Sequence, residues 1–140
     1  MTHKSPRIAE LIEPFRGQEL DARYLAYFEC FNRQLFFEAH DVLEDLWLPQ
    51  RGGSNGSFHK GLIQLAGAFV HLRKGRLRPA GALLRLAEAN LAQYPSVHER
   101  LDVGRVLRMI RCWLEELERT DFGANPLEGG QAPEIRLGTD

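Results

Sequence analysis

The sequence has few cysteines, no long hydrophobic run and no signal-like leader, and each absence excludes a class of protein. Cys30 and Cys112 are its only cysteines and form no CxxC motif, so we expect buried free thiols in a reducing compartment. No apolar run approaches the roughly 18 to 20 residues that cross a membrane. The first ten residues lack the apolar segment of a signal peptide. These features predict a cytoplasmic protein with no membrane partner.

An excess of one charge is also absent. The chain has 18 Lys and Arg residues against 19 Asp and Glu residues, which gives a formal net charge of −1. Binding to nucleic-acid phosphates normally requires a strongly positive surface. The local group of cations at residues 73–78 lies near the expected end of a helix, where cations interact favourably with the helix dipole. We therefore expect no nucleic-acid partner.

Helical periodicity is present along most of the chain. With 140 residues and 44% hydrophobic content, the sequence is long enough to bury the core of one domain. Apolar residues recur at steps of three and four in five segments, and short breaks containing Gly, Pro or polar residues separate them. The fifth segment has two candidate N-caps, Ser96 and Asp102. The first four predicted helices are 20–31, 35–48, 57–74 and 79–94. The fifth begins at Ser96 or at Asp102 and ends at 119.

This pattern predicts an all-α, single-domain bundle of about five helices with short connections. The single helical domain spans 1–140, with its globular part at about 20–119 and peripheral segments at 1–19 and 120–140. Residues 7–13 are expected to form a short helical turn. The C-terminal tail is expected to be irregular, with residues 132–137 extended across the bundle.

His3 and His59 are expected to be solvated. Seven large side chains are predicted to be mostly buried: Phe36, Leu43, Trp47, Leu65, Phe69, Ile110 and Trp113.

The stretch FFEAHDVLEDLW, at residues 36–47, carries the most chemistry. His40 falls inside the apolar arc of the second predicted helix, and Glu44 lies one turn further on, so the two side chains can converge on one point. Glu38 and Asp41 are expected to point away from that arc. One of them is a candidate base, because a carboxylate beside a metal-bound water can take its proton.

A second group of polar residues lies in the third predicted helix. Gln64 and His71 share one face, and Gly67 leaves space between them. If this helix packs antiparallel to the second, these residues meet His40 and Glu44. Two imidazoles and a carboxylate around an open position are typical of a catalytic zinc or iron site. The sequence therefore predicts a metal site of His40, Glu44 and His71, with Gln64 as a polar neighbour.

The same four residues also fit a non-catalytic protein. In that alternative they form a buried polar network that fixes the register of the helices in a structural or interaction module. An open pocket would favour the metal site, whereas a sealed and fully hydrogen-bonded cluster would favour the network. The sequence contains no HExxH motif and no pair of ExxH motifs to decide between them.

Three segments in order, FNRQLFFEAHDVLEDLW, GLIQLAGAFVHLRKG and GALLRLAEANL, resemble the helical family called domain of unknown function 309, over residues 24–107. Because members are often labelled predicted metal-dependent hydrolases, the resemblance implies a divalent metal (zinc or iron) and a small-molecule substrate that it does not identify. A homo-oligomer is compatible with it. Two positions depart from the family pattern, since Asp41 replaces a glutamate and Gln34 replaces a glycine at a helix end. The pattern carries over onto Glu38, His40, Glu44, Trp47, Gln64 and His71.

Overall fold

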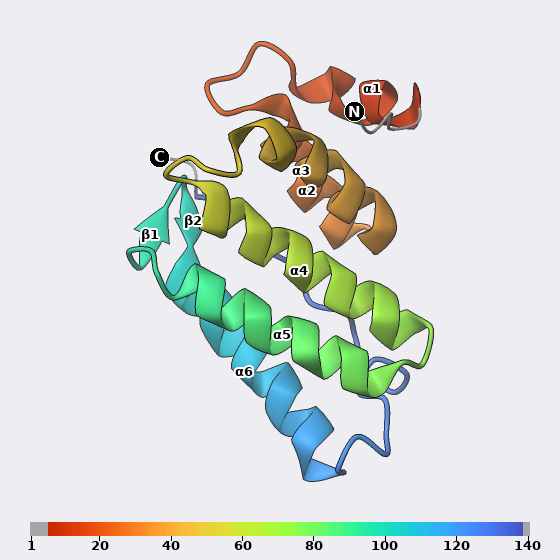
Figure 1. Ribbon diagram of the computed structural model, residues 1–140. Helices are drawn as coiled ribbons and strands as arrows, with labels where there is room; N and C mark the ends of the chain where they lie inside the picture. The colour runs from red at the N-terminus through yellow and green to blue at the C-terminus, as the bar shows by residue number, and fades with distance from the viewer. Residues whose placement is uncertain (1–5, 139–140) are drawn as a thin grey trace.

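Six α-helices account for most of residues 6–138, the part of the chain that the computed structural model describes (Figure 1). The prediction of a single all-α domain is confirmed, and the strands within residues 6–138 form one hairpin with two residues in each strand. His3 lies outside the described residues. The elements are α1 (Pro6–Ile12), a 3-10 turn (Glu13–Phe15), α2 (Ala22–Asn32), α3 (Phe36–Gln50), α4 (Gly56–Arg73), α5 (Leu77–Leu91), β1 (Val97–His98), β2 (Leu101–Asp102) and α6 (Val103–Arg119).

Consecutive helices lie beside one another, and α4 runs through the middle of the bundle between α3 and α5 (Figure 1). Helix α4 is buried around most of its circumference, which is typical of a central helix. Gly61 allows its close approach to α5, because a Cβ there would lie 2.9 Å from the Leu91 Cγ atom. No helix in the described residues combines the length and apolar character that a membrane span requires.

The core is centred on Phe69 of α4. Its ring centroid lies 5.6 Å from that of Phe31, 5.2 Å from that of Phe36 and 4.9 Å from that of Trp113. One side chain therefore joins α2, α3, α4 and α6. Five of the seven residues predicted to be buried are fully enclosed, whereas Trp47 and Trp113 are only partly buried because each lines a cavity.

The predicted end of the second helix at Pro49 is wrong, since α3 continues to Gln50. Proline has no N–H to donate to the carbonyl four residues earlier, so the Asp45 carbonyl loses its usual intrahelical partner. The Arg23 guanidinium of α2 donates to that oxygen at 3.4 Å and also to the Asp45 carboxylate at 3.0 Å. A contact between helices thus satisfies the acceptor that the proline leaves free.

Asp102 is the N-cap of α6, and its side chain accepts a hydrogen bond from the Arg105 backbone N–H at 3.0 Å. The alternative cap at Ser96 is wrong, because the intervening residues form the β1–β2 hairpin. Its two central residues, Glu99 and Arg100, have φ angles of 50° and 63°. Two left-handed residues in succession are typical of a tight two-residue hairpin turn, which breaks the helical path.

Gln34 adopts the left-handed backbone geometry that glycine usually supplies at a helix end. Its φ angle is 63°, and the Leu35 N–H donates to the Cys30 carbonyl at 2.8 Å, closing α2 with a Schellman motif. The same motif closes α4, where Gly75 has a φ of 73°. The helix end is therefore normal, and a residue with a Cβ occupies a position that favours glycine.

We expect Gln34→Gly to raise the free energy of unfolding by about 1 kcal/mol, because glycine adopts the left-handed conformation without a steric penalty. The change also removes an exposed hydrogen bond from Arg73 to the Gln34 side chain, which is long at 3.3 Å and therefore contributes little. The matched control is Gly75→Gln, which should lower stability by a similar amount. Urea melts in which Gln34→Gly is destabilised would contradict the prediction.

His59 is buried, with only 6% of its surface exposed, so the expectation of a solvated side chain is wrong. Its ring lies against Phe58 and Tyr24, because α4 turns this position toward α2. Burial lowers the pKa of His59 from its usual value of 6.5, although the nearby Glu99 and Asp21 carboxylates partly oppose the shift. Cys112 also differs from expectation, since its thiol is exposed whereas Cys30 is buried.

This lowered pKa predicts a loss of stability in mild acid. The unfolded chain takes up the His59 proton at a higher pH than the folded protein does, so stability is full above about pH 6.5 and falls as the pH drops below that value. His59→Gln, which cannot titrate, should make the free energy of unfolding less dependent on pH between about 6.5 and 5. Equal slopes for both proteins in denaturant melts across this range would refute the assignment.

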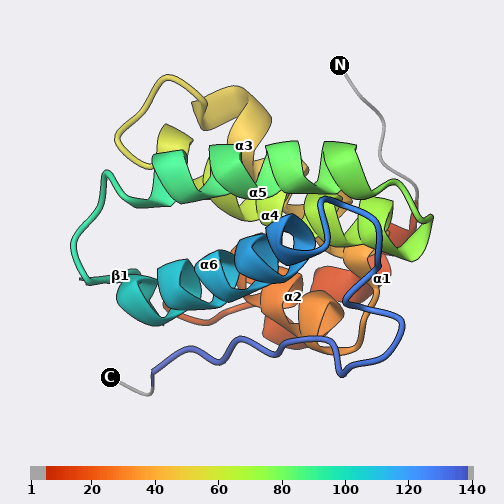
Figure 2. The ribbon, with the colours of Figure 1, turned by 90° about the horizontal axis from the view of Figure 1, so that it is seen from below.

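The tail, residues 120–138, runs along the bundle beside α6 and α2 (Figure 2). Asn32 fixes it with two hydrogen bonds: its amide donates to the Ile135 carbonyl at 2.9 Å and accepts from the Ile135 N–H at 2.7 Å. The Ile135 side chain is buried. As predicted, residues 132–137 therefore lie across the bundle without regular secondary structure.

Candidate functional site

Helices α3 and α4 pack side by side and antiparallel, so that one edge of each helix faces the other (Figure 1). Contacts at both ends define their register. At one end the Phe36 and Phe69 rings lie 5.2 Å apart, and at the other the Trp47 indole N–H donates to the Gly56 carbonyl at 3.0 Å. Residues at steps of three and four along both helices therefore face a shared space.

That space is a cavity of about 340 Å³, here called the α3–α4 cavity. It brings together the four polar residues that the sequence placed between these helices. Leu83 of α5 closes one side. The lining residues are Phe37, His40, Glu44, Trp47, Lys60, Ile63, Gln64, Gly67, Val70, His71 and Leu83.

His40, Asp41 and Glu44 form a compact cluster on α3. One candidate ligand atom from each side chain lies within 4.8 Å of the other two. The His40 Nδ1 and Asp41 Oδ1 atoms are 3.1 Å apart, with 31% and 27% of the two side chains exposed. Asp41 therefore contacts its neighbour His40, although it is not one of the residues that line the α3–α4 cavity.

The hydrogen bond between His40 and Asp41 fixes the tautomer of the imidazole. An ionised carboxylate only accepts hydrogen bonds, so the Nδ1 atom of His40 carries the proton. In the neutral imidazole the lone pair then lies on Nε2, where it can bind a metal or take a proton from water. Carboxylates orient ligand histidines in this way in many metal sites.

His71 lines the same cavity but is not part of the 4.8 Å cluster. Its Nδ1 atom is buried and has no hydrogen-bond partner within the described part of the chain. Desolvation lowers the pKa of His71, and the nearby Arg76 and Lys74 cations lower it further. Both effects favour the neutral imidazole, the state in which histidine binds metals.

Glu38, one of the two candidate bases, is not brought to the cavity. Its carboxylate lies 3.5 Å from the Arg7 guanidinium of α1, on another side of α3. Asp41 is therefore the candidate that lies beside His40.

Gln64 and Gly67 shape the cavity from α4. The Gln64 side-chain oxygen accepts a hydrogen bond from Asn90 at 2.7 Å, which ties α4 to α5. A Cβ on Gly67 would lie 3.3 Å from Leu83 Cδ1 and 4.0 Å from His40 Cδ2. The absence of a side chain at Gly67 therefore keeps the space beside the His40 ring open.

The sequence reasoning did not identify Lys60 and Phe37 as lining residues. Lys60 lies over the Trp47 indole, with its Nζ atom 4.4 Å from the ring centroid. Phe37 stacks on His40 with 11° between the ring planes, and 60% of its surface is exposed. Their positions repeat the spacing of His40 and Glu44 along the two facing helix edges, a pattern that identifies them once the helix pairing is known.

The donor atoms of the cluster fit a divalent transition metal. One imidazole nitrogen and carboxylate oxygens suit zinc or iron better than magnesium or calcium, which prefer oxygen ligands alone. The buried Nδ1 atom of His71, in the same cavity, has no hydrogen-bond partner among the described residues, which fits a site that a ligand completes. His40 and Glu44 would hold the ion, with Asp41 orienting the histidine.

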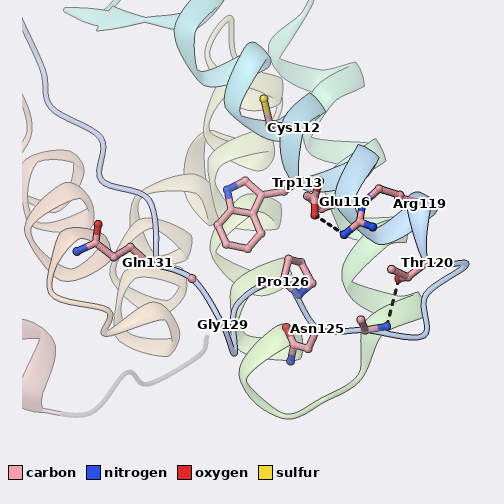
Figure 3. A pocket seen from close by; sticks show the side chains of 11 residues that line it. Cys112, Trp113, Glu116, Arg119, Thr120, Asn125, Pro126, Gly129 and Gln131 are labelled. Atoms are coloured by element: carbon pink, nitrogen blue, oxygen red, sulfur yellow. Dashed lines mark hydrogen bonds and ion pairs between the residues drawn. The ribbon is translucent and has the colours of Figure 1, made fainter.

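A larger cavity of about 440 Å³ lies between α6 and the tail. The Trp113 indole reaches from α6 toward Pro126 of the tail (Figure 3). Its charged residues neutralise one another, because Arg119 donates to the Glu116 carboxylate at 3.0 Å. This cavity has no cluster of ligand atoms among the described residues, so the chemistry is concentrated in the α3–α4 cavity.

The fold and the α3–α4 cavity define a small helical protein with a histidine–carboxylate cluster beside two packed helices. Residues 24–83 match the model of the family described as "Domain of unknown function (DUF309)". The resemblance seen in the sequence is thereby confirmed over this segment, although the match ends before residue 107. Every residue that lines the α3–α4 cavity falls within the matched segment.

A protein from Aquifex aeolicus (strain VF5), named only as an uncharacterized protein, is 26% identical over 99 residues. The match covers 71% of this chain and 28% of the relative's own length. No solved structure gives a significant match.

Proposed function

We propose that this protein binds one divalent transition metal in the α3–α4 cavity and hydrolyses a small molecule there. The observation that carries this proposal is the His40–Asp41 hydrogen bond at the wall of a partly open cavity. His40 belongs to a cluster in which one ligand atom each of His40, Asp41 and Glu44 lies within 4.8 Å of the other two, and the bond to Asp41 leaves Nε2 of His40 for an ion.

The proposal assigns separate tasks to the side chains of this cavity. A bound zinc or iron ion would supply an acidified water at neutral pH. His40 and Glu44 would hold that ion, and Asp41 would keep the His40 ring in the required orientation. Trp47, Ile63 and Leu83 would exclude bulk water from one side of the substrate.

The lining residues also favour hydrolysis over a covalent mechanism. None of the described residues around the cavity is a serine, threonine or cysteine, the usual nucleophiles of acyl transfer. Water is therefore the best-supported nucleophile, and an ester or amide is the substrate class that it would attack.

One contact in particular supports the alternative of a structural network. The hydrogen bond from Asn90 to Gln64 does join α4 and α5. The side chains of His40 and Asp41 instead remain about one-third exposed at a cavity, where a network that fixes register would be sealed. We therefore favour the metal-dependent hydrolase.

The direct test is titration of metal-free protein, purified without a histidine tag, with Zn²⁺ and with Co²⁺. Calorimetry should show one ion per chain, and Co²⁺ should give the visible absorption of a bound, low-coordinate ion. The loaded protein should then hydrolyse simple ester or amide substrates faster than the metal-free protein does. Failure to bind either ion saturably would overturn the proposal.

A further inference from the structure

Lys60 places a positive charge at the far end of the α3–α4 cavity. Its Nζ atom lies over the Trp47 ring, 4.4 Å from the centroid, and the side chain is only partly exposed. No carboxylate of the described residues lies within ion-pair distance of it. Among the described residues, no carboxylate therefore neutralises the Lys60 ammonium group that lines the cavity.

The cavity wall between Lys60 and His40 combines apolar and polar side chains. Ile63 of α4 and Leu83 of α5 supply its apolar surface, and Gly67 leaves room beside His40. Glu44 and Gln64 are its polar residues. A ligand lying along this wall would bury an apolar body between a cation at one end and the metal-binding cluster at the other.

We propose that the cavity binds a small apolar carboxylic acid, with its carboxylate on Lys60 and its hydrolysable ester or amide bond beside His40. The inference rests on the proposed function for the position of that bond. A single lysine is a point charge suited to one carboxylate, whereas phosphate sites usually supply several donors or a forked arginine. Lys60 is the only Lys or Arg among the described lining residues.

The separation of the two ends sets the length of the ligand. His40 and Trp47 are seven positions apart on α3, which corresponds to about 10 Å along the helix axis at 1.5 Å per residue. That span equals about three residues of extended peptide. The volume of about 340 Å³ lies at the small end of ligand pockets, which fits a small molecule of this length.

Hydrolysis of such a substrate balances with water alone. The oxygen of water forms a bond to the acyl carbon, and the bond from that carbon to the leaving oxygen or nitrogen breaks. The proton that leaves the water passes to the leaving group. The anionic end on Lys60 takes no part in this exchange and serves only to position the substrate.

The test measures carboxylate binding in the presence of a chelator, so that it does not depend on metal. In a Trp113→Phe background Trp47 is the only remaining tryptophan, and its fluorescence reports on the cavity wall. The probes are octanoate, its neutral counterpart octanamide, and butanoate, which is too short to reach from Lys60 to His40. The same titrations by calorimetry on the unaltered protein exclude an effect of the background substitution.

Octanoate should bind saturably and at least ten-fold more tightly than octanamide or butanoate. Lys60→Met should remove the advantage of octanoate over octanamide, while the control Arg108→Met, at an exposed position on α6, should preserve it. Equal binding of octanoate and octanamide to the unaltered protein, or an unchanged advantage in Lys60→Met, would overturn the inference. Carboxylate binding without metal binding would instead overturn only the proposed hydrolase.

Discussion

Replacing His40 with alanine should weaken Zn²⁺ binding at least 100-fold while leaving the helical circular dichroism unchanged. The imidazole supplies the only nitrogen ligand in the His40–Asp41–Glu44 cluster, and the carboxylates that remain bind transition metals less tightly. The side chain is 31% exposed, so its removal leaves no large void in the core. Calorimetric titration of the metal-free variant measures the effect.

Three further variants sharpen this experiment. Asp41→Asn keeps the shape of the side chain but weakens the orienting hydrogen bond, and it should reduce affinity roughly 10- to 100-fold. Glu38→Gln, which lies away from the cavity, and His98→Ala, which removes a histidine bonded to Asn55, should bind Zn²⁺ normally. Tight binding by His40→Ala, or equal losses in His98→Ala, would place the metal elsewhere.

Phe69→Ala should lower the free energy of unfolding by about 3 to 5 kcal/mol, a large part of the total stability of a small domain. The ring is completely buried and contacts aromatic rings from three other helices. Its removal leaves a cavity that these rings cannot fill together, because each is fixed on a different helix. Urea denaturation provides the measurement.

The matched control for Phe69 is the exposed phenylalanine at the cavity mouth. Phe37 has 60% of its surface in solvent, so Phe37→Ala removes the same number of atoms but should cost less than about 1 kcal/mol. Comparable losses for both variants would show that Phe69 is not the centre of the core.

The sequence predicted the helices well because their information is local. Periodicity defined the apolar faces, and one of the two candidate N-caps of the last helix, Asp102, is the cap of α6. The grouping of His40, Glu44, Gln64 and His71 followed from two helix edges and the antiparallel pairing that a short loop imposes. Each of these steps uses residues close together in the chain.

The remaining features depend on tertiary contacts that periodicity does not encode. Asp41 turns to His40 through the rotation of its own side chain, and Glu38 is held away by Arg7 of α1. Trp47 was expected in the core, but the cavity between the helices leaves it partly exposed beside Lys60. These details determine the chemistry of the site, and they arise only after the helices have packed.

The contact between Asn32 and the tail has a consequence for the order of folding. Its partners are separated by 103 positions, whereas the pairs α2–α3, α3–α4 and α4–α5 each join neighbours in the chain. Closing a longer loop costs more entropy, and contacts between distant positions slow the transition state in which they form. The helical pairs should therefore assemble first, and the Ile135 segment should dock last onto a bundle that already exists. Its two hydrogen bonds would then affect mainly the rate at which the tail detaches, while the rate at which the helices assemble stays nearly constant.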